Sequence, residues 1–391
     1  MCAWRLPFRS KRKIRIAVDL VRLLPGGENG GVKPAVFAFL QWMIRTEGDR
    51  VELVFIANEA THGEVSSLAR PTDQIWCSHQ SAADPEPGSG PDPVDTERLV
   101  TSGVDLLYNP FGPDRLGGGK VPFVSLLIDL LHREVPEALP PEEVDHRERF
   151  FADACARAVA IQVISDDVGR RLSEAYGLGE RRIFRTYLPL QQVHSSDRGN
   201  SGRSAADGLF FIYPANPWPH KNHRRLLEAF CRFLDGAPDG NGDWKLVLTG
   251  AGTESADPLG LIIDRLGLGG GSVIRAGHLD QADYRATLRA AHGMIFPSLN
   301  EGFGIPILEA QQAGIPLACS NVGSLPEVAG TGARYFDPKQ VGEIADALSE
   351  MARDEGLRRR LIQAGRQNLG RFDFDCEARG FAQALRKAAA G

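Results

Sequence analysis

Short apolar runs alternate with stretches of helical periodicity along the chain. The first half contains the runs KIRIAVD, VELVFIA, VDLLYN, VPFVSLLID and AVAIQVIS, and the second half contains GLFFIYP, WKLVLTG, SVIRAG, HGMIFPS, IPLACS and ARYFD. Runs that are apolar at nearly every position are typical of parallel strands covered by helices on both faces. The alternation therefore predicts an α/β fold class with a parallel sheet in each half of the chain.

A polar, glycine-containing segment, HSSDRGNSGRSAAD at 194–207, separates the two halves and has the composition of a linker. Because 391 residues exceed what one hydrophobic core usually organises, two domains are expected. We predict Rossmann-like, doubly wound domains over 1–195 and 208–371 that face each other across a central cleft. The last helix, over 372–391, is expected to pack back towards the N-terminal domain.

The composition is close to that of an average soluble protein, with 42% hydrophobic and 24% charged residues, a net charge of −5 and a pI near 6.0. This charge balance argues against nucleic acid as a partner. The six cysteines form no CxxC pair, and no run approaches the roughly 20 apolar residues of a membrane span. We therefore expect a cytoplasmic protein.

The first segment, MCAWRLPFRSKRKIRIAV, interleaves basic residues with Trp4, Leu6 and Phe8 and contains no acidic residue. Two interpretations stay open: a solvated tail before the first strand, or peripheral contact with the anionic inner face of the membrane. Pro7 interrupts any amphipathic helix here, which favours the solvated tail.

The segment SLNEGFGIPILEAQQAGIPL at 298–317 combines a glycine turn with the start of a helix. Gly302 and Gly304 let the backbone approach a ligand closely. Pro306 suits a first helical turn, so we expect the helix to start at about Ile305. The backbone amides at such a start form an anion site, and in an α/β domain they face the ligand cleft.

Glu301 and Glu309 flank this anion site, before and after the turn. Carboxylates beside a phosphate site repel the phosphate unless they accept hydrogen bonds from hydroxyl groups. The pattern therefore suits a nucleotide sugar, with phosphates on the amides and hydroxyls on the carboxylates. The alternative interpretation is a surface glutamate and a glutamate that only interacts with the helix dipole.

Four segments carry a resemblance to a known family. They are NEGFGIPILEAQQAGIPLACSNVGSLPEV, with its Glu-x7-Glu spacing, YPANPWPHKNHRRLLEAF, VISDDVGRRLSEAYGLGERRI and IDLLHREVPEAL. Together, and in their order along the chain, they resemble the retaining family-4 glycosyltransferases, which have the GT-B fold. The likeness runs from about Lys13 to the C-terminus and is weak between residues 58 and 103. The PHKNH part is similar to bacterial polysaccharide-assembly enzymes.

The resemblance implies roles for individual residues. Glu309 would bind the ribose, Glu301 the donor sugar and Lys221 the departing diphosphate, while His132 would contact the donor sugar near the reacting carbon. The catalytic residues implied are thus His132, Lys221 and Glu301. The donor-binding residues implied are Gly30, Gly31, Asn216, Lys221, Asn222, Glu301, Gly302, Phe303, Gly304, Ile305 and Glu309.

Two of these assignments leave alternatives. The family's arginine before the lysine is absent from PANPWPH, so Asn216, His220 or Asn222 would share its task. The glycines at 30 and 31 belong to PGGENGGVKPAV, which resembles the loop beside the donor phosphate but also reads as a plain strand-to-helix connection.

Neither a metal nor a cofactor is expected. The DFD stretch at 373–375 has the Asp-x-Asp pattern of a metal site, yet it lies in the approach to the last helix, far in sequence from the cleft elements. The resemblance implies that lysine and helix amides stabilise the leaving diphosphate without a metal ion.

The resemblance implies a retaining hexosyltransferase that acts on a growing glycan or a lipid-linked acceptor, as in lipopolysaccharide assembly, with GDP-mannose as the first choice of donor. Two alternatives stay open: a sugar-nucleotide 2-epimerase of the same fold, and a non-catalytic nucleotide-sugar-binding subunit that has lost the arginine. A dinucleotide dehydrogenase is disfavoured because no GxGxxG follows the first strand.

Overall fold

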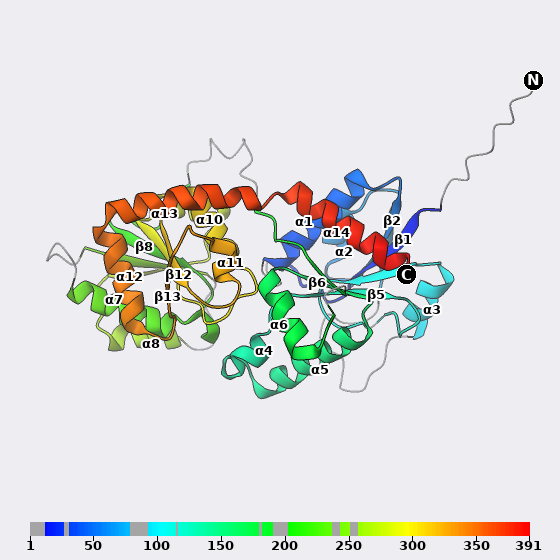
Figure 1. Cartoon of the computed structure of the whole chain (residues 1–391), viewed down its shortest axis with the longest axis horizontal. Coiled ribbons are helices and arrows are strands. Elements are labelled where there is room, and N and C mark those ends of the chain that lie inside the picture. Colours follow the sequence, from blue (N-terminus) through cyan, green and yellow to red (C-terminus); the bar gives the residue numbers. More distant parts are fainter. Residues whose placement is uncertain are drawn as a thin grey trace, which may run out of the picture.

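The computed structural model describes residues 12–26, 31–78, 93–114, 116–179, 182–190, 202–236, 243–250 and 257–391. The predicted donor-binding residue Gly30 and most of the basic N-terminal segment lie outside these residues. The described chain forms two lobes, each built around a parallel sheet (Figure 1).

Within the described residues, the N-terminal sheet has seven strands in the order β3-β2-β1-β4-β5-β6-β7, and all neighbours are parallel. The strands are β1 (Ile14–Leu20), β2 (Val51–Ala57), β3 (Gln74–Cys77), β4 (Leu106–Asn109), β5 (Phe123–Leu127), β6 (Ala160–Val163) and β7 (Ile183–Arg185). The helical elements are α1 (Val32–Thr46), α2 (His62–Leu68), α3 (Pro93–Thr101), α4 (Leu131–Glu134), η1 (Pro136–Ala138), α5 (Pro141–Arg157) and α6 (Asp166–Tyr176).

The C-terminal sheet of the described chain has six parallel strands in the order β10-β9-β8-β11-β12-β13. They are β8 (Phe210–Pro214), β9 (Lys245–Thr249), β10 (Val273–Gly277), β11 (Gly293–Phe296), β12 (Leu317–Ser320) and β13 (Arg334–Phe336). The helical elements are η4 (Pro219–Lys221), α7 (His223–Asp235), α8 (Pro258–Arg265), α9 (Gln281–Ala290), α10 (Ile305–Ala313), α11 (Leu325–Ala329), α12 (Val341–Arg353), α13 (Glu355–Asn368), η5 (Leu369–Arg371) and α14 (Phe374–Ala389).

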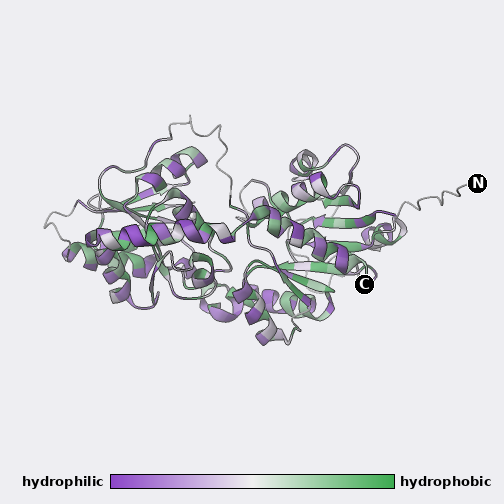
Figure 2. Cartoon of the chain, turned by 45° about the horizontal axis from the view of Figure 1, so that its top comes forward, coloured by the Kyte–Doolittle hydropathy of each residue, from purple (hydrophilic) through white to green (hydrophobic). Residues whose placement is uncertain are grey.

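The predicted fold class, two doubly wound α/β units with parallel sheets, is confirmed. Strands β4, β5, β11 and β12 are buried at every position, as expected for strands with both faces covered. Figure 2 shows these hydrophobic strands at the centre of each lobe and mixed helices around them. In the described part of the chain no helix is long and apolar enough to cross a membrane.

The C-terminal helix returns to the N-terminal lobe. After α13, which lies along the C-terminal lobe, α14 crosses over and contacts α1, β1, β4, β5 and β7 (Figure 1). The ring centroid of Phe381 lies 5.1 Å from that of Phe39 and 5.3 Å from that of Tyr108. The apolar face of α14 therefore completes the core of the N-terminal domain and ties the two lobes together.

The two lobes touch closely at the turn between β11 and α10. A Cβ added to Gly302 would collide with the carbonyl oxygen of Ile128, and one added to Gly31 would lie 2.7 Å from the Cδ1 of Ile305. The Ser165 hydroxyl also donates a hydrogen bond to the Gly302 carbonyl at 2.8 Å. Glycine is needed at position 302 because the backbone of the opposite lobe occupies the space of a side chain.

Candidate functional site

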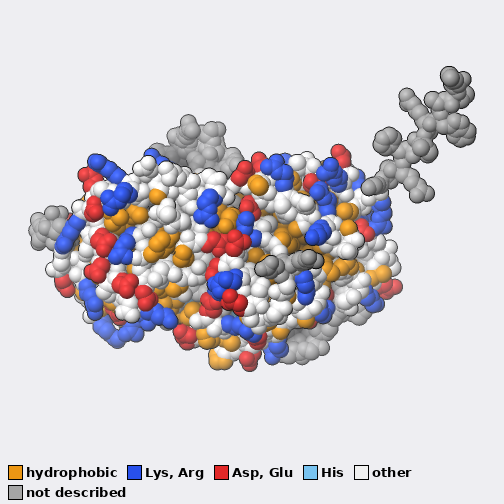
Figure 3. All heavy atoms as spheres, viewed as in Figure 1, with side chains coloured by type: hydrophobic (Ala, Val, Ile, Leu, Met, Phe, Trp, Pro, Cys, Tyr) orange, Lys and Arg blue, Asp and Glu red, His pale blue; other side chains and the backbone are white. Residues whose placement is uncertain are grey.

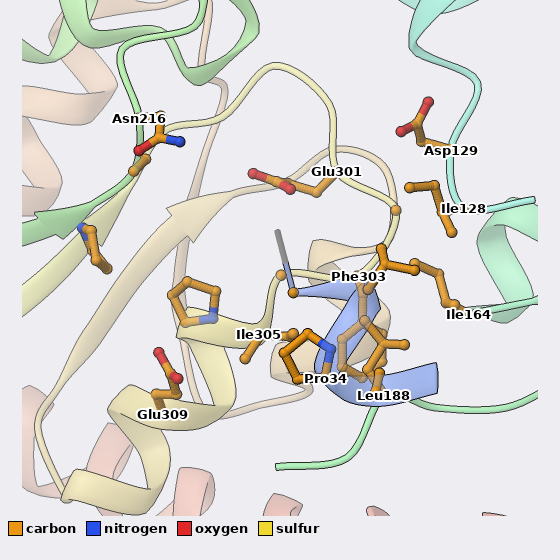
Figure 4. A pocket seen from close by; sticks show the side chains of 18 of the residues that line it. Pro34, Ile128, Asp129, Ile164, Leu188, Asn216, Glu301, Phe303, Ile305 and Glu309 are labelled. Carbon is orange, nitrogen blue, oxygen red and sulfur yellow. The ribbon is translucent and has the colours of Figure 1, made fainter. Parts of the chain in front are cut away.

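A cavity of about 1270 Å³ lies between the lobes and is lined by residues from both of them (Figure 4). It opens where the carboxyl ends of strands in the two parallel sheets face each other, which is the usual ligand position in open α/β sheets. Figure 4 shows Glu301, Glu309 and Asn216 on elements of the C-terminal domain, and Ile128, Asp129 and Ile164 on the opposite side.

The start of α10 forms the floor of the cavity. Helix α10 begins at Ile305, as predicted, with Pro306 in its first turn. Its N-cap residue is Gly304, which has φ of 93° and no side chain to cap the first-turn amides. The positive end of the helix dipole therefore faces the cavity without a side-chain acceptor, which suits an anionic ligand such as a diphosphate.

Lys221 and Glu301 form an ion pair inside the cavity. The distance from Lys221 Nζ to Glu301 Oε1 is 2.7 Å, and the two side chains are only 14% and 12% exposed. Lys221 ends the short helix η4, whose backbone is held by a hydrogen bond of 2.7 Å from the Tyr213 hydroxyl to the Lys221 carbonyl. The pair places one ammonium and one carboxylate beside the start of α10.

Glu309 lies one turn further along α10 and also lines the cavity. Its Oε2 accepts a hydrogen bond of 2.7 Å from the Tyr284 hydroxyl of α9. Burial raises the pKa of the Glu309 carboxyl, while the hydrogen bond from Tyr284 and the charge of Arg285 act in the opposite direction. A ligand that donates hydrogen bonds to this carboxylate would stabilise its charged form.

Most predicted donor-binding residues reach the cavity. Lys221, Asn216 and Gly31 line it together with the segment from Glu301 to Ile305 and with Glu309. Further lining residues that were not predicted come from the end of β9 and the loop after it, and from the segment between β10 and the start of α9. They are Thr249, Gly250, His278, Leu279, Asp280 and Gln281.

His132 does not reach the cavity. Its side chain is completely buried, with Nε2 at 3.2 Å from the Tyr176 hydroxyl and 3.5 Å from Glu148 Oε2. Its ring packs at 4.6 Å from the ring of Phe151, and burial lowers its pKa. Helix α4 turns His132 into the contact with α5 and α6, and His132 is not among the residues that line the cavity. Its contact with the donor sugar stays a prediction.

Asn222 is also turned away from the cavity. It has φ of 63° and links η4 to α7. Its side-chain amide donates hydrogen bonds to the carbonyl oxygens of Pro297 at 3.0 Å and Pro338 at 2.8 Å. These bonds fix the loop that carries Lys221, and Asn222 is not among the residues that line the cavity. Direct donor binding by Asn222 stays a prediction.

The cavity lining includes three further residues that were not among the predicted site residues. Asp129 and Arg147 form an ion pair of 3.3 Å on the N-terminal side, and Trp218 lies on the loop before Lys221. Arg147 comes from the interior of α5, where no sequence motif marks it. The sequence does give a signal for Trp218. A tryptophan between two prolines in a polar loop is not where a core residue is expected, which indicates an exposed ring.

The DFD stretch has a structural function at the start of α14. The Asp373 carboxylate accepts hydrogen bonds from the amides of Asp375 at 2.9 Å and Cys376 at 3.2 Å. The Asp375 carboxylate accepts a hydrogen bond of 2.8 Å from the indole nitrogen of Trp42 on α1. Among the described residues, no group of three or more His, Cys, Asp or Glu side chains is placed to hold a metal ion.

Residues 200–368, which form most of the C-terminal domain, match the family model described as glycosyl transferases group 1. In this region the chain is similar to the group 1 glycosyltransferases. Enzymes of this group are the family-4 glycosyltransferases with the GT-B fold, and most of the predicted donor residues of this chain line the cavity between its lobes.

Two curated relatives illustrate the match. The O-antigen chain mannosyltransferase B of Escherichia coli is 28% identical over 247 residues, which cover 61% of this chain and 64% of the relative. The D-inositol 3-phosphate glycosyltransferase of Streptomyces avermitilis is 30% identical over 202 residues, which cover 46% and 42%. The matches thus span less than two thirds of the length of these relatives.

Solved structures share the fold over nearly the whole chain. A glycosyltransferase from Rickettsia africae superposes with a TM-score of 0.67 at 13% identity, covering 97% of this chain and 99% of that one. A protein from Anabaena, solved in complex with UDP-glucose, has a TM-score of 0.68 at 18% identity and covers 96% and 100%. At these identities the likeness establishes the fold.

Proposed function

We propose that this glycosyltransferase moves a hexose, with mannose as the first choice, from a nucleoside diphosphate sugar to a hydroxyl of a growing glycan or lipid-linked acceptor. The observation that carries the proposal is the Lys221–Glu301 ion pair beside the start of α10, with Glu309 one turn away. Mannose is chosen because two kinds of relatives, the O-antigen chain mannosyltransferase and a serotype-specific mannosyltransferase, carry that activity in their names. GDP-mannose is our first choice of the nucleotide sugar.

The donor would bind through its three parts. Its diphosphate would lie on the first-turn amides of α10 and on the Lys221 ammonium, which are the positive groups of the cavity. Its ribose would donate hydrogen bonds to Glu309, and its sugar hydroxyls would donate to Glu301. Lys221 would exchange its carboxylate partner for phosphate oxygens, which leaves Glu301 available to the sugar.

The reaction would proceed with retention of configuration at the anomeric carbon. As the bond from the anomeric carbon to the diphosphate oxygen breaks, negative charge grows on the diphosphate, and the Lys221 ammonium and the α10 amides stabilise it. The acceptor oxygen forms the new bond from the same face. Its proton passes to the leaving phosphate oxygen, so no protein nucleophile is required.

A panel of nucleotide sugars in a thermal-shift assay tests the donor. A ligand at 100 times its dissociation constant stabilises the folded state by about 2.7 kcal/mol. GDP-mannose is expected to raise the melting temperature more than UDP-glucose or other sugar nucleotides. If none of them raises it, the proposed function is wrong; if another donor raises it most, the choice of mannose is wrong.

The product identifies the reaction type. With GDP-mannose and a mannoside acceptor, NMR should show a new glycosidic bond with the anomeric configuration of the donor. Release of GDP that forms no glycoside, or conversion of the sugar nucleotide into its 2-epimer, would favour one of the other activities considered above.

We also propose that the transfer needs no divalent cation, because Lys221 and the α10 amides already supply positive charge to the leaving diphosphate. Activity is expected to continue in EDTA. Loss of activity in EDTA and its recovery with Mg²⁺ or Mn²⁺ would contradict this part of the proposal.

A further inference from the structure

Trp218 is an exposed tryptophan at the edge of the cavity. The large hydrophobic side chains that are exposed among the described residues are Val100, Val159, Leu209, Trp218 and Leu261. Of these, Trp218 is the one that lines the cavity, and its side chain is 49% exposed. A tryptophan left in water forgoes a large gain from burial, so a ring held at the mouth of a site calls for a ligand that covers it.

The backbone around Trp218 holds the ring in place. Pro217 and Pro219 flank it and restrict the main chain on both sides. The Trp218 amide donates a hydrogen bond of 2.8 Å to the Asn216 carbonyl, and its own carbonyl accepts one of 2.9 Å from the Lys221 amide. The loop thus fixes the main chain at Trp218, and the indole ring lies 5.7 Å from the ring of His220 at the cavity.

The position of Trp218 is at the end of the cavity where the donor sugar is proposed to lie. The Lys221 Nζ lies 5.9 Å from the centroid of the Trp218 ring, and Lys221 in turn contacts Glu301. Glu309, the proposed ribose ligand, is hydrogen-bonded to Tyr284 of α9 and not to the Trp218–Lys221 loop. A ligand on Trp218 would therefore lie beside the sugar part of the donor and away from the ribose.

Charged and apolar side chains of the N-terminal lobe line the same cavity. They are Asp129, Leu131, Ala138, Leu139 and Arg147. Burial and the Lys221 charge lower the pKa of His220 to about 4, and the charges of Asp129 and Arg147 also act on it. Asp129 and Arg147 of the N-terminal lobe thus line the same cavity as Trp218 and His220 of the C-terminal lobe.

A pyranose ring fits this combination of groups. One face of a hexose carries C–H bonds that pack on an aromatic ring, while its edge carries hydroxyl groups that need polar partners. The Asp129 carboxylate accepts hydrogen bonds and is oriented by one from the Leu131 amide at 2.9 Å, and the Arg147 guanidinium donates them. A purely lipid ligand would leave these two charges in an apolar contact, which costs free energy.

We propose that Trp218, Asp129 and Arg147 form the subsite for the acceptor, and that the acceptor group bound there is the terminal hexopyranose of a glycan. This assignment rests on the proposed glycosyl transfer and adds the chemical class of the acceptor. The sugar ring stacks on Trp218, and Asp129 and Arg147 bind its hydroxyls from the opposite lobe. The attacking hydroxyl is thereby held next to the donor sugar.

The test uses the full chain, GDP-mannose as donor and an α-linked mannobiose as acceptor. Trp218→Ala is expected to raise the KM for mannobiose by about tenfold or more, because it removes the stacking surface. Trp218→Phe keeps an aromatic ring and should raise it by less than about threefold. The affinity of both variants for GDP-mannose, measured by calorimetry, should stay within about twofold of the parent. Leu261→Ala, at the most exposed hydrophobic residue outside the cavity, is the matched control.

Asp129→Asn provides a second variant from the opposite lobe. It should also raise the acceptor KM, because the amide replaces a charged acceptor by a neutral one while the size is kept. The subsite is overturned if Trp218→Ala leaves the KM for mannobiose unchanged, or if it weakens GDP-mannose binding as much as it weakens the acceptor. It is also overturned if the parent binds GDP-mannose but transfers mannose only to a lipid that carries no sugar. Absence of any sugar-nucleotide binding would instead overturn the proposed function itself.

Discussion

Lys221 and Glu301 illustrate what single side chains contribute to the site. Both are nearly buried, and each partly neutralises the other at 2.7 Å. A charge in such surroundings needs a partner, since desolvation is costly. The pair therefore keeps an ammonium and a carboxylate ready beside α10, and a diphosphate that binds the ammonium replaces one partner by another.

Lys221→Ala should reduce turnover more than donor binding. The charge on the diphosphate grows as the glycosidic bond breaks, so the ammonium interacts more strongly with the transition state than with the bound donor. We expect kcat to fall by about 100-fold or more, as on removal of a group that stabilises developing charge. Steady-state kinetics measure this, with Lys339→Ala as a control at an exposed lysine. A raised donor KM at unchanged kcat would make Lys221 a plain binding residue.

Glu309→Ala should weaken the binding of the nucleoside diphosphate. A hydrogen bond from a ribose hydroxyl to a charged acceptor contributes about 1.5 to 3 kcal/mol, which corresponds to roughly 10- to 150-fold in Kd. Tyr284→Phe, which removes the hydrogen bond that orients the carboxylate, should have a smaller effect. Calorimetry measures the Kd for GDP in each variant. Glu355→Ala on the exposed face of α13 is the control. An unchanged Kd in folded Glu309→Ala would remove Glu309 from the ribose site.

Helix α6 shows how whole elements join the two lobes. The amides of Asp166 and Asp167, in its first turn, each donate a hydrogen bond of 2.8 Å to the carboxylate of Glu327. Glu327 belongs to α11 of the C-terminal domain, so a carboxylate of one lobe caps a helix of the other. The positive end of the helix dipole favours this arrangement. Figure 3 shows acidic and basic side chains gathered on the visible face where the lobes meet.

Glu327→Ala should loosen the contact between the lobes. Loss of a helix cap typically lowers the free energy of unfolding by about 0.5 to 2 kcal/mol. Here the cap is also a contact between the lobes, so its loss weakens that contact. We expect a lower midpoint in urea and a larger radius of gyration by small-angle X-ray scattering for the ligand-free protein. Glu327→Gln, which retains one acceptor oxygen, should lie between the parent and the alanine variant. If both measurements match the parent, the contact contributes nothing to the arrangement of the lobes.

At the scale of the whole molecule, buried histidines make stability depend on pH. The pKa values of His220 and His223 are lowered to about 4, in both cases chiefly by burial. In the unfolded chain a histidine titrates near 6.5. Between these values the unfolded state binds more protons, so their contribution to stability is complete above pH 6.5 and declines as the pH falls towards 4. The lowered pKa values of His132 and His292 act in the same direction.

We therefore expect the melting temperature to fall between pH 7 and pH 5. The raised pKa of Glu309 acts in the opposite direction, because its protonated form is favoured in the folded state, but a single carboxyl opposes several histidines. The carboxyls with lowered pKa, Glu64, Glu148 and Glu350, contribute only nearer their ordinary value of 4.5 and below. Calorimetry across this range measures the effect, and His220→Gln should reduce it. A melting temperature that is constant from pH 7 to pH 5 would show that the histidines are not held neutral.

The amino-acid sequence alone determined the fold class and the start of α10. Apolar runs specify parallel strands because both faces of each strand are covered, and this pattern is local in the chain. The same holds for Gly304 and Pro306, whose backbone preferences set the beginning of the helix at Ile305. Interactions between neighbouring residues decide such features, so a linear pattern is sufficient to predict them.

The tertiary structure decided which polar side chains meet in the cavity. Nothing in the local sequence separates His132 from His220, yet α4 turns the former into a core of Phe151 and Tyr176, while η4 holds the latter at the cavity. Lys221 and Glu301 form their ion pair although they are 80 residues apart in the sequence. The α6 amides and Glu327 are 160 and 161 residues apart. Contacts of this kind depend on how the two domains pack against each other, and that packing is a property of the folded chain as a whole.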